Sequence, residues 1–331
     1  MTAPAFSVVV IAWNSAEALE TCIGSLRESA AAAETPIEIV VVDNASSDAS
    51  IDTARRLGSD VVISNPLNAG YGVAAMQGLA RATGRWALLV NPDVVVRRDF
   101  VAALAVAAGS SPEDVATLAP DVRFSSDHSI VNFRGIEVDD AGIPAEVEAA
   151  THATPVHAER DVFGGSSGAC LLRIDAVRSV GGIEPAYFAY YEDVDLAWRL
   201  RRAGYRALLV PAALAFHEGS ASLGADSPLK AFLVARNRRL LFRLNGPHDL
   251  GAMARRTVVE LGHGTVTMLS GGGLAPWRGR ADALRLRAYT RFVRRSRSLD
   301  PASAEPVTAP REPLLRTFRR KRATRRAMTG E

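Results

Sequence analysis

The sequence has few cysteines and no long apolar run, and both absences limit what the protein can be. Only two of its 331 residues are cysteine, Cys22 and Cys170, and neither belongs to a CxxC pair. We therefore expect two reduced, buried thiols with no disulfide or metal role. No segment approaches the eighteen or so apolar residues of a membrane-spanning helix, and the N-terminus shows no signal-peptide pattern. We expect a globular, cytoplasmic protein.

The first half of the chain alternates short apolar strands with amphipathic helices. Strands are predicted over 6–12, 37–42, 60–64 and 86–90, and helices over 17–30, 48–57 and 69–82. Uncharged strands that alternate with helices form a mostly parallel sheet with helices on both faces. The turn after the first strand reads AWNSAEAL. Because it lacks GxGxxG, a Rossmann dinucleotide site is disfavoured.

Polar side chains follow each of these strands at its carboxyl end. They are Asn14, Asp43, Asn44, Asn65, Asn68, Asn91 and Asp93. Any one of them alone is a common turn residue. Ligands of such sheets, however, bind outside the carboxyl ends of the strands. Four strand ends in succession therefore favour a shared ligand pocket.

The motif NPD places the Asn91 amide and the Asp93 carboxylate after an apolar strand. Oxygen ligands of this kind suit Mg²⁺ or Mn²⁺, ions that often bridge substrate phosphates. His217 follows a second strand-like run, LLVPAALAF. A lone histidine is ordinarily structural, and a metal role for His217 requires that Asp93 lie beside it.

Three acids, Glu192, Asp193 and Asp195, occur within the stretch FAYYEDVDLAWRLRRAGY. Acids in the first turn of a helix interact favourably with the helix dipole, so capping alone would account for them. The preceding aromatic rings would also suit a saccharide, and a carboxylate at the helix start can accept a proton from a hydroxyl nucleophile. Both interpretations remain open on these residues alone, and for Asp195 capping is sufficient.

Taken in order, these segments resemble glycosyltransferase family 2, especially its bacterial rhamnosyltransferase-like branch. The matching stretches, over about residues 6–224, are SVVVIAWN, VVVDNASSD, NAGYGVAAMQGLARATG, LLVNPD, GGSSGACLLR, YYEDVDLAWRLRRAGY and VPAALAFHEGSAS. The resemblance implies an α/β fold of the GT-A type, which binds nucleotide sugars. Its mixed, mostly parallel sheet would be flanked by helices, with a helical basic C-terminal extension.

The resemblance also implies roles for individual residues. Asp193 would be the general base that deprotonates an acceptor hydroxyl. The acceptor side would include Gly164, Gly165, Glu192 and Trp198. The nucleotide-sugar donor would contact Ala12, Asn14, Asp43, Asn68, Gly70, Asn91 and Asp93. The metal, Mg²⁺ or Mn²⁺, would be held by Asp93 and His217, and more weakly by Asn91, which replaces the first Asp of the D-x-D pattern.

The C-terminal part of the chain differs from the rest in charge. Residues 255–331 hold 18 Lys or Arg and 6 Asp or Glu, net +12, whereas residues 1–254 carry −9. We expect a transferase domain over 1–227, a helical region over 228–310 and a basic, disordered tail over 311–331. In the helical region, amphipathic helices are predicted at 229–244 and 284–293. The tail would be solvated or would contact an anionic membrane surface, and no nucleic-acid partner is expected.

The sequence thus predicts an inverting, metal-dependent hexosyltransferase, peripheral on the cytoplasmic face of a membrane. The branch it resembles implies dTDP-rhamnose as donor. The acceptor would be a saccharide or polyprenyl-linked saccharide in cell-envelope polysaccharide synthesis. A transferase for UDP-hexose or UDP-N-acetylhexosamine is an alternative, and so is a non-catalytic saccharide-binding relative. The presence of Asp93, Asp193 and His217 together argues for catalysis.

Overall fold

A mixed ten-stranded sheet forms the centre of the molecule in a computed structural model that describes residues 5–218, 227–246, 249–269 and 273–296. Its strand order is β10-β12-β6-β11-β4-β1-β2-β3, with β5 paired to β12 and β7 to β6. The strands are β1 (Phe6–Ala12), β2 (Ile37–Asp43), β3 (Val61–Ser64), β4 (Trp86–Val90), β5 (Val94–Val96), β6 (Val115–Phe124), β7 (Val131–Phe133), β10 (Arg160–Val162), β11 (Ala169–Arg173) and β12 (Arg206–His217). A separate pair consists of β8 (Ile136–Val138) and β9 (Pro144–Glu146).

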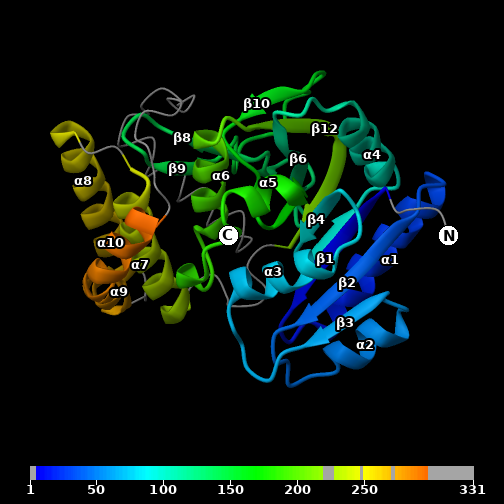
Figure 1. Cartoon of the computed structure of the whole chain (residues 1–331), viewed down its shortest axis with the longest axis horizontal. Helices are drawn as coiled ribbons and strands as arrows, with labels where there is room; N and C mark the ends of the chain where they lie inside the picture. Colours follow the sequence, from blue (N-terminus) through cyan, green and yellow to red (C-terminus); the bar gives the residue numbers. More distant parts are fainter. Residues whose placement is uncertain (1–4, 219–226, 247–248, 270–272, 297–331) are drawn as a thin grey trace.

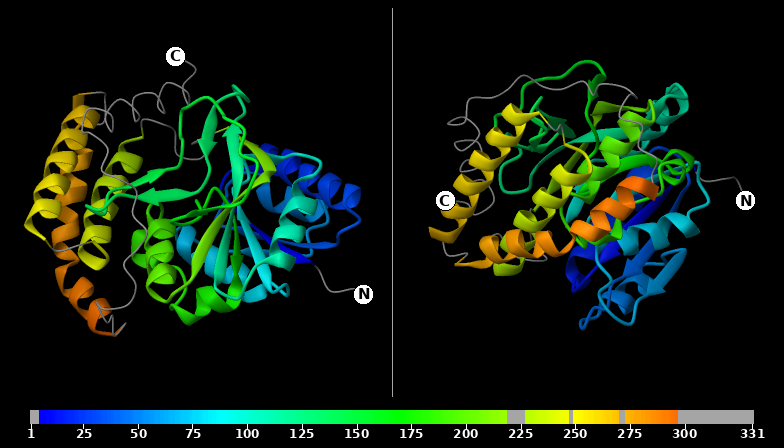
Figure 2. Two further views of the ribbon diagram at one scale, coloured as in Figure 1. Left: turned by 90° about the horizontal axis from the view of Figure 1, so that it is seen from above. Right: turned by 60° about the vertical axis from the view of Figure 1, so that its left-hand side comes forward.

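Helices cover both faces of this sheet, as Figures 1 and 2 show. They are α1 (Ala16–Ala32), α2 (Ser50–Arg56), α3 (Tyr71–Arg81), α4 (Phe100–Ser110), α5 (Ile174–Ser179) and α6 (Glu192–Arg202), with the short 3₁₀ helix η1 (Pro185–Tyr187) before α6. Because side chains alternate along a strand, Val8 and Val10 of β1 join the core under α1 and α4, whereas Val9 and Ile11 join the core under α3 and α5. Cys22 and Cys170 are free and buried in these two cores, as predicted.

The strands β4, β1, β2 and β3 are parallel, so their carboxyl ends lie at one edge of the sheet. In this register Ala12 is beside Asp43, and Asp43 is beside Ser64. The other half of the sheet is mixed, since β11 runs antiparallel to both β4 and β6. The predicted mixed sheet flanked by helices is therefore confirmed.

Four helices follow the sheet: α7 (Pro228–Leu244), α8 (Leu250–Thr267), α9 (Ala275–Arg285) and α10 (Arg287–Ser296). The helix predicted over 284–293 is confirmed except for a break at Leu286, where α9 ends at Arg285 and α10 begins at Arg287. The helix α8 was not predicted. None of the helices in the described ranges is long and apolar enough to cross a bilayer. The expected basic tail, 311–331, lies outside the described residues.

Candidate functional site

The parallel strands bring polar groups to one edge of the sheet. Ala12 and Asp43 end β1 and β2, and both are fully buried. The Oδ2 atom of Asp43 accepts a hydrogen bond from the backbone N–H of Ser46 at 3.0 Å. Its Oδ1 atom is buried and accepts none from the described part of the chain. A buried carboxylate oxygen without a donor suits a ligand N–H group.

Asn14, Asn68 and Gly70 shape the loops beside this edge. Asn14 Oδ1 accepts a hydrogen bond from the backbone of Ser47 at 2.8 Å, and Asn68 Oδ1 accepts one from Gly70 at 3.0 Å. Gly70 has a φ of 88°, and a Cβ there would lie 2.7 Å from Phe188. A side chain is therefore excluded from this position. Contact of these three residues with a donor remains a prediction.

Asp93 and His217 meet where β5 and β12 pair, with Asp93 just before β5 and His217 at the end of β12. The Oδ1 atom of Asp93 lies 3.2 Å from Nε2 of His217, and both side chains are buried. The other ring nitrogen, Nδ1, lies 3.4 Å from Oδ1 of Asn132 on β7. An amide oxygen can only accept, so this contact places a proton on Nδ1 and directs Nε2 toward the carboxylate.

Two electron-rich atoms that face each other at 3.2 Å need a proton or a cation between them. Their separation is close to that of neighbouring ligands in an octahedral shell with bonds of about 2.1 Å. Asp93 and His217 therefore fit a divalent ion. No cluster of three or more His, Cys, Asp or Glu side chains occurs among the described residues, so such an ion would need further ligands. Asn132 was missed from the sequence, because only the fold brings it to His217.

The loop 164–168 connects the segment that contains Asn91 to the acid pair. Asn91 donates its backbone N–H to the carbonyl of Gly168 at 2.9 Å, and the N–H of Ser167 donates to Oδ2 of Asp193 at 3.0 Å. Two neighbouring peptide units of one loop thus contact both Asn91 and Asp193. Asn91 contacts Gly168, Val94 and Cys22 through its backbone, and its role as a metal ligand remains a prediction.

Gly164 and Gly165 have a packing reason to be glycine. A Cβ on Gly164 would lie 2.3 Å from Cβ of Ala197, and one on Gly165 would lie 2.6 Å from Cβ of Cys170. The space that these glycines leave is filled by α6 and β11. Their approach to a substrate remains a prediction.

Glu192 and Asp193 are adjacent carboxyls at the start of α6, and within the described residues neither forms an ion pair with an arginine. Asp193 accepts hydrogen bonds from the backbone N–H groups of Ser167 and Val194, and burial raises its pKa. Burial, together with the charge of Asp193, raises the pKa of Glu192 to about 8. The Oε2 atom of Glu192 is buried and accepts no hydrogen bond within the described residues. Burial thus favours the protonated form of Glu192 near neutral pH, and by raising the pKa of Asp193 it also makes that carboxylate a stronger proton acceptor.

Asp195 and Trp198 have structural contacts. Asp195 is fully buried, lies 2.7 Å from Nη2 of Arg199 and accepts a hydrogen bond from Asn245 at 2.7 Å. Its capping interpretation is therefore wrong, because the carboxylate binds an arginine and not the helix terminus. Trp198 is only 3% exposed and packs edge to face against Phe163. Any effect of Trp198 on the acceptor would therefore be indirect.

The loop before α6 has an unusual backbone. Positive φ angles of 65°, 70° and 72° occur at Phe188, Tyr190 and Tyr191. Such angles are costly for bulky residues and persist only where the surroundings enforce them. Asn237 of α7 is fully buried, and its Nδ2 lies 2.7–2.9 Å from the carbonyl oxygens of Tyr187, Ala189 and Tyr190. Asn237 was missed because the sequence predicts an amphipathic helix here but does not predict which segment the helix packs against.

A comparison with protein families decides the identity of the fold. The family model described as "Glycosyl transferase family 2" matches residues 7–178, more than half of the chain. The chain belongs to glycosyl transferase family 2. The family predicted from the motifs is confirmed.

Relatives of this family 2 chain agree with that assignment. An N-acetylglucosaminyl-diphospho-decaprenol L-rhamnosyltransferase of Mycobacterium tuberculosis (strain ATCC 25618 / H37Rv) is 29% identical over 249 residues, 66% of this chain and 78% of the relative. The mannosyltransferase PcManGT from Pyrobaculum calidifontis, solved with GDP-Man and Mn²⁺, has a TM-score of 0.53 at 17% identity and covers 100% of this chain and 87% of its own. GalNAc-T7, solved with UDP, GalNAc and Mn²⁺, has a TM-score of 0.58 at 16% identity, covering 87% and 57%. Both structures support the GT-A fold alone.

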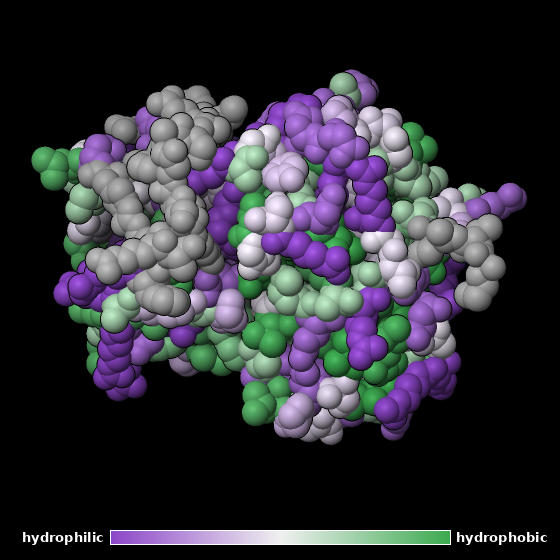
Figure 3. All heavy atoms as spheres, viewed as in Figure 1, coloured by the Kyte–Doolittle hydropathy of each residue, from purple (hydrophilic) through white to green (hydrophobic). Residues whose placement is uncertain are grey.

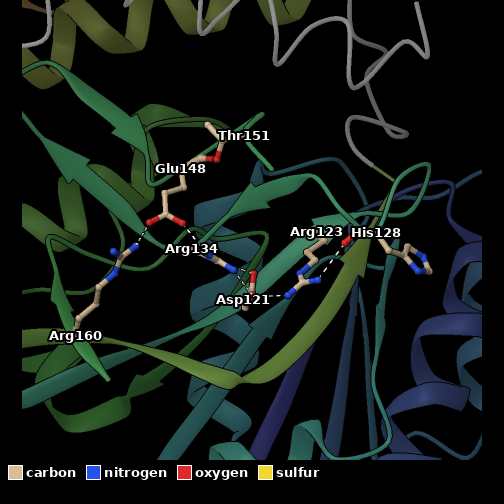
Figure 4. Close-up of polar contacts among 7 residues, drawn as sticks. All are labelled: Asp121, Arg123, His128, Arg134, Glu148, Thr151 and Arg160. Atoms are coloured by element: carbon tan, nitrogen blue, oxygen red, sulfur yellow. Dashed lines mark hydrogen bonds and ion pairs between the residues drawn. The ribbon is translucent and has the colours of Figure 1, made fainter. Parts of the chain in front are cut away.

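A second group of buried charges in the family 2 chain is fully paired. Arg134 is 1% exposed and contacts Asp121 with two nitrogens at 2.8 and 3.0 Å, and it also binds Glu148. Arg160 contacts the other oxygen of Glu148 at 2.6 Å, and Arg123 contacts Asp121 at 3.2 Å (Figure 4). These pairs join β6 to the segments around β7 and β10. They leave no free charge for chemistry and are structural.

Proposed function

We propose that the protein is an inverting, metal-dependent transferase that moves a hexose, L-rhamnose from dTDP-rhamnose, to a saccharide or polyprenyl-linked saccharide of the cell envelope. The observation that carries the proposal is the half-buried Asp193 carboxylate, which among the described residues accepts hydrogen bonds from backbone amides and is tied through one loop to the segment of Asn91 and Asp93. The choice of sugar is supported by the branch that the sequence resembles and by the rhamnosyltransferase at 29% identity.

The residues divide the reaction between them. Asp193 takes the proton from the acceptor hydroxyl while that oxygen forms a bond to the anomeric carbon. The bond from that carbon to the nucleotide diphosphate breaks on the opposite side, which inverts the anomeric configuration. The N–H groups of Ser167 and Val194 fix the carboxylate during this proton transfer.

Asp93 and His217 would hold the metal ion, with Asn91 as a weaker neutral ligand. A bound Mg²⁺ or Mn²⁺ stabilises the negative charge of the leaving diphosphate. Asn132 fixes the tautomer of His217, so that Nε2 is free to bind. At the carboxyl end of β2, the Asp43 Oδ1 atom would accept a hydrogen bond from the N3–H of the pyrimidine base. The base would lie near Ala12 and the loop of Asn14.

The same proposal places the protein at the cytoplasmic face of a membrane, where a lipid-linked acceptor is available. The transferase domain over 1–227 would act with the helical region 228–310 and the tail 311–331 facing the anionic surface. This arrangement is supported by charge, because residues 255–331 carry net +12.

A ligand screen followed by a transfer assay tests the proposal. Binding raises stability by RT ln(1 + [L]/Kd), about 2.7 kcal/mol at a hundredfold excess over Kd. We expect dTDP-rhamnose with Mn²⁺ or Mg²⁺ to raise the unfolding temperature more than UDP-glucose or UDP-N-acetylglucosamine, and to be consumed when acceptor is added. A shift with UDP-sugars alone would assign the other donor class. Donor binding without turnover on any acceptor would indicate a non-catalytic relative.

A further inference from the structure

The exposed side of α8 carries no charged side chain, although the helix itself contains several. Its exposed residues, from position 250 to the end of the described segment, are Leu250, Gly251, Met253, Ala254, Thr257, Val258, Leu261, Thr265, Val266 and Leu269. Six of them are large and hydrophobic, and Leu250 and Leu269 are 84% and 77% exposed. A helix that faces water ordinarily presents its polar side outward. The outer face of α8 is therefore suited to an apolar surrounding.

The charged side chains of α8 point into the protein. Glu260 pairs with Arg280 of α9 at 2.9 Å, and Arg255 pairs with Asp139 at 3.4 Å. Arg256 is 5% exposed and lies over the ring of Phe242. Because buried ion pairs are at best weakly stabilising, stability alone does not explain this inverted helix. The inward direction of these charged side chains leaves the outer face of α8 uncharged, as contact with an apolar surrounding would require.

The surroundings of α8 are strongly basic. The helix lies at the edge of the molecule away from β2 and β3 (Figures 1 and 2), and its outer tip is hydrophobic in the space-filling view (Figure 3). The neighbouring α9 and α10 carry exposed arginines, namely Arg278, Arg285, Arg287 and Arg291. Residues 228–331 hold 23 Lys or Arg and 7 Asp or Glu, whereas residues 1–227 hold 16 and 29.

We propose that the outer face of α8 is a docking surface for an anionic lipid bilayer. In such an interfacial helix the apolar side chains enter the boundary between headgroups and acyl chains, about 5–10 Å deep. The surrounding arginines attract the anionic headgroups. The proposal depends on the proposed function only for the reason why docking would be useful, namely that it brings the site to a lipid-linked acceptor. Docking itself requires no transfer.

Charge also favours a membrane over a second copy of the chain. Two copies that met through α8 would bring together two regions that are each strongly positive. An anionic leaflet has the opposite sign. The lipid surface is therefore the occupant that matches both the apolar face and the charge around it.

Vesicle flotation with the full chain tests the proposal. The double variant Met253→Glu/Leu261→Glu places two carboxylates on the outer face, and both positions are exposed, so the unfolding temperature should not change. We expect binding to phosphatidylcholine vesicles with phosphatidylglycerol to weaken by about tenfold or more. The matched control is Val106→Glu on α4, where the side chain is 72% exposed, and it should bind as the wild type does.

Salt separates the apolar face from simple charge attraction. Salt screens headgroup attraction but leaves apolar insertion. The difference between the double variant and the wild type should therefore persist in high salt. Equal binding of the two proteins in low and high salt overturns the proposal, as does a wild type that binds no vesicles. Sedimentation that shows a wild-type dimer and a monomeric variant, with no vesicle binding, assigns the face to a second copy and also overturns it.

A water-soluble acceptor keeps this test apart from the test of function. The double variant should transfer sugar to such an acceptor at the wild-type rate while it loses vesicle binding. If the wild type docks through α8 but transfers no sugar to any acceptor, the proposed function fails and the docking surface stands.

Discussion

Two groups of carboxylates with little exposure to solvent differ in their partners. Asp121 and Asp195 are each paired with an arginine, Arg134 and Arg199, which neutralises them in place. Asp193, by contrast, accepts hydrogen bonds from backbone amides. A buried acid with an arginine holds elements of the fold together. A half-buried acid held by backbone amides keeps a negative charge that can accept a proton from a substrate, and groups of this kind are found at functional sites.

The pKa values follow the same division. Burial alone would raise the pKa of Glu148, but hydrogen bonds from Arg160 and Arg134 lower it below the ordinary range. Burial and the neighbouring Asp193 raise the pKa of Glu192 to about 8. The arginine network thus stabilises carboxylates as ions, whereas the start of α6 favours the protonated form.

The largest effect should come from Asp193→Asn, which removes the base and keeps the shape. We expect kcat to fall by about 10²–10⁴-fold, the usual contribution of a general base. Donor affinity should stay near the wild-type value, because Asp193 would meet the acceptor. Rapid-mixing kinetics and a donor titration check both statements. Turnover within a few-fold of wild type would show that Asp193 is not the base. The difference in hydrogen-bond partners between the two groups of carboxylates would then have no catalytic meaning.

Arg134→Met tests the other side of the contrast. It leaves Asp121 and Glu148 without their shared partner, and we expect a loss of about 3–5 kcal/mol in the free energy of unfolding. Urea denaturation measures it. The control is Arg97→Met, since the exposed pair of Arg97 and Asp99 should contribute only about 0–1 kcal/mol. Equal losses for both variants would show that burial of the network does not matter.

The metal pair gives the next prediction. His217→Ala should sharply raise the Mn²⁺ concentration needed for half-maximal transfer. Asn132→Leu, which removes only the partner of Nδ1, should weaken metal affinity by about 10- to 100-fold. Titration of activity with Mn²⁺ after chelation distinguishes the two variants. An enzyme that is fully active in chelator would rule out the metal site.

Asn237→Asp tests whether α7 positions the loop before α6. The near-isosteric carboxylate cannot donate to the three carbonyl oxygens, and the expected result is a loss of about 1–3 kcal/mol in stability together with a lower kcat. Hydrogen exchange of residues 186–191 reads the loop directly. Phe242→Leu on the same helix packs in a different cluster, with Ala252 and Val259, and should lower stability without changing the loop.

The last prediction concerns the pH dependence of stability in Glu192→Gln. Because the pKa of Glu192 rises from 4.5 to about 8 on folding, its contribution to stability is complete below pH 4.5 and is lost as pH rises to about 8. The glutamine variant lacks this loss. Urea midpoints at several pH values should show that the stability of the variant increases relative to that of the wild type between about pH 5 and about pH 9. Parallel curves would mean that Glu192 has an ordinary pKa.

The parts of the fold that local patterns determine were predictable. The strand expected at 86–90 is β4, and the polar residues at strand ends meet at one edge because parallel strands share a direction. The partners that fix the site come from far along the chain, as with Asn132, which is 85 residues from His217. No local pattern specifies such a contact.

The helix α8 was missed for a different reason. Gly251, Gly262 and Gly264, together with the β-branched run Thr257 to Val259, lower its helix propensity. Its side chains also reverse the usual arrangement, with apolar residues outside. The usual rule places the apolar face of a helix against the protein core. Applied to α8, that rule predicts the wrong orientation of the helix.

The loop 164–168 has one further consequence. Ser167 and Gly168 are consecutive, and through them one peptide segment holds both Asp193 and Asn91. In the proposed reaction, this segment therefore fixes the distance between the leaving diphosphate and the base, and the sugar ring must fit within that distance. An insertion between Ser167 and Gly168 would change the spacing of these two contacts, and with it both the size of sugar ring that fits and the proton transfer that we propose.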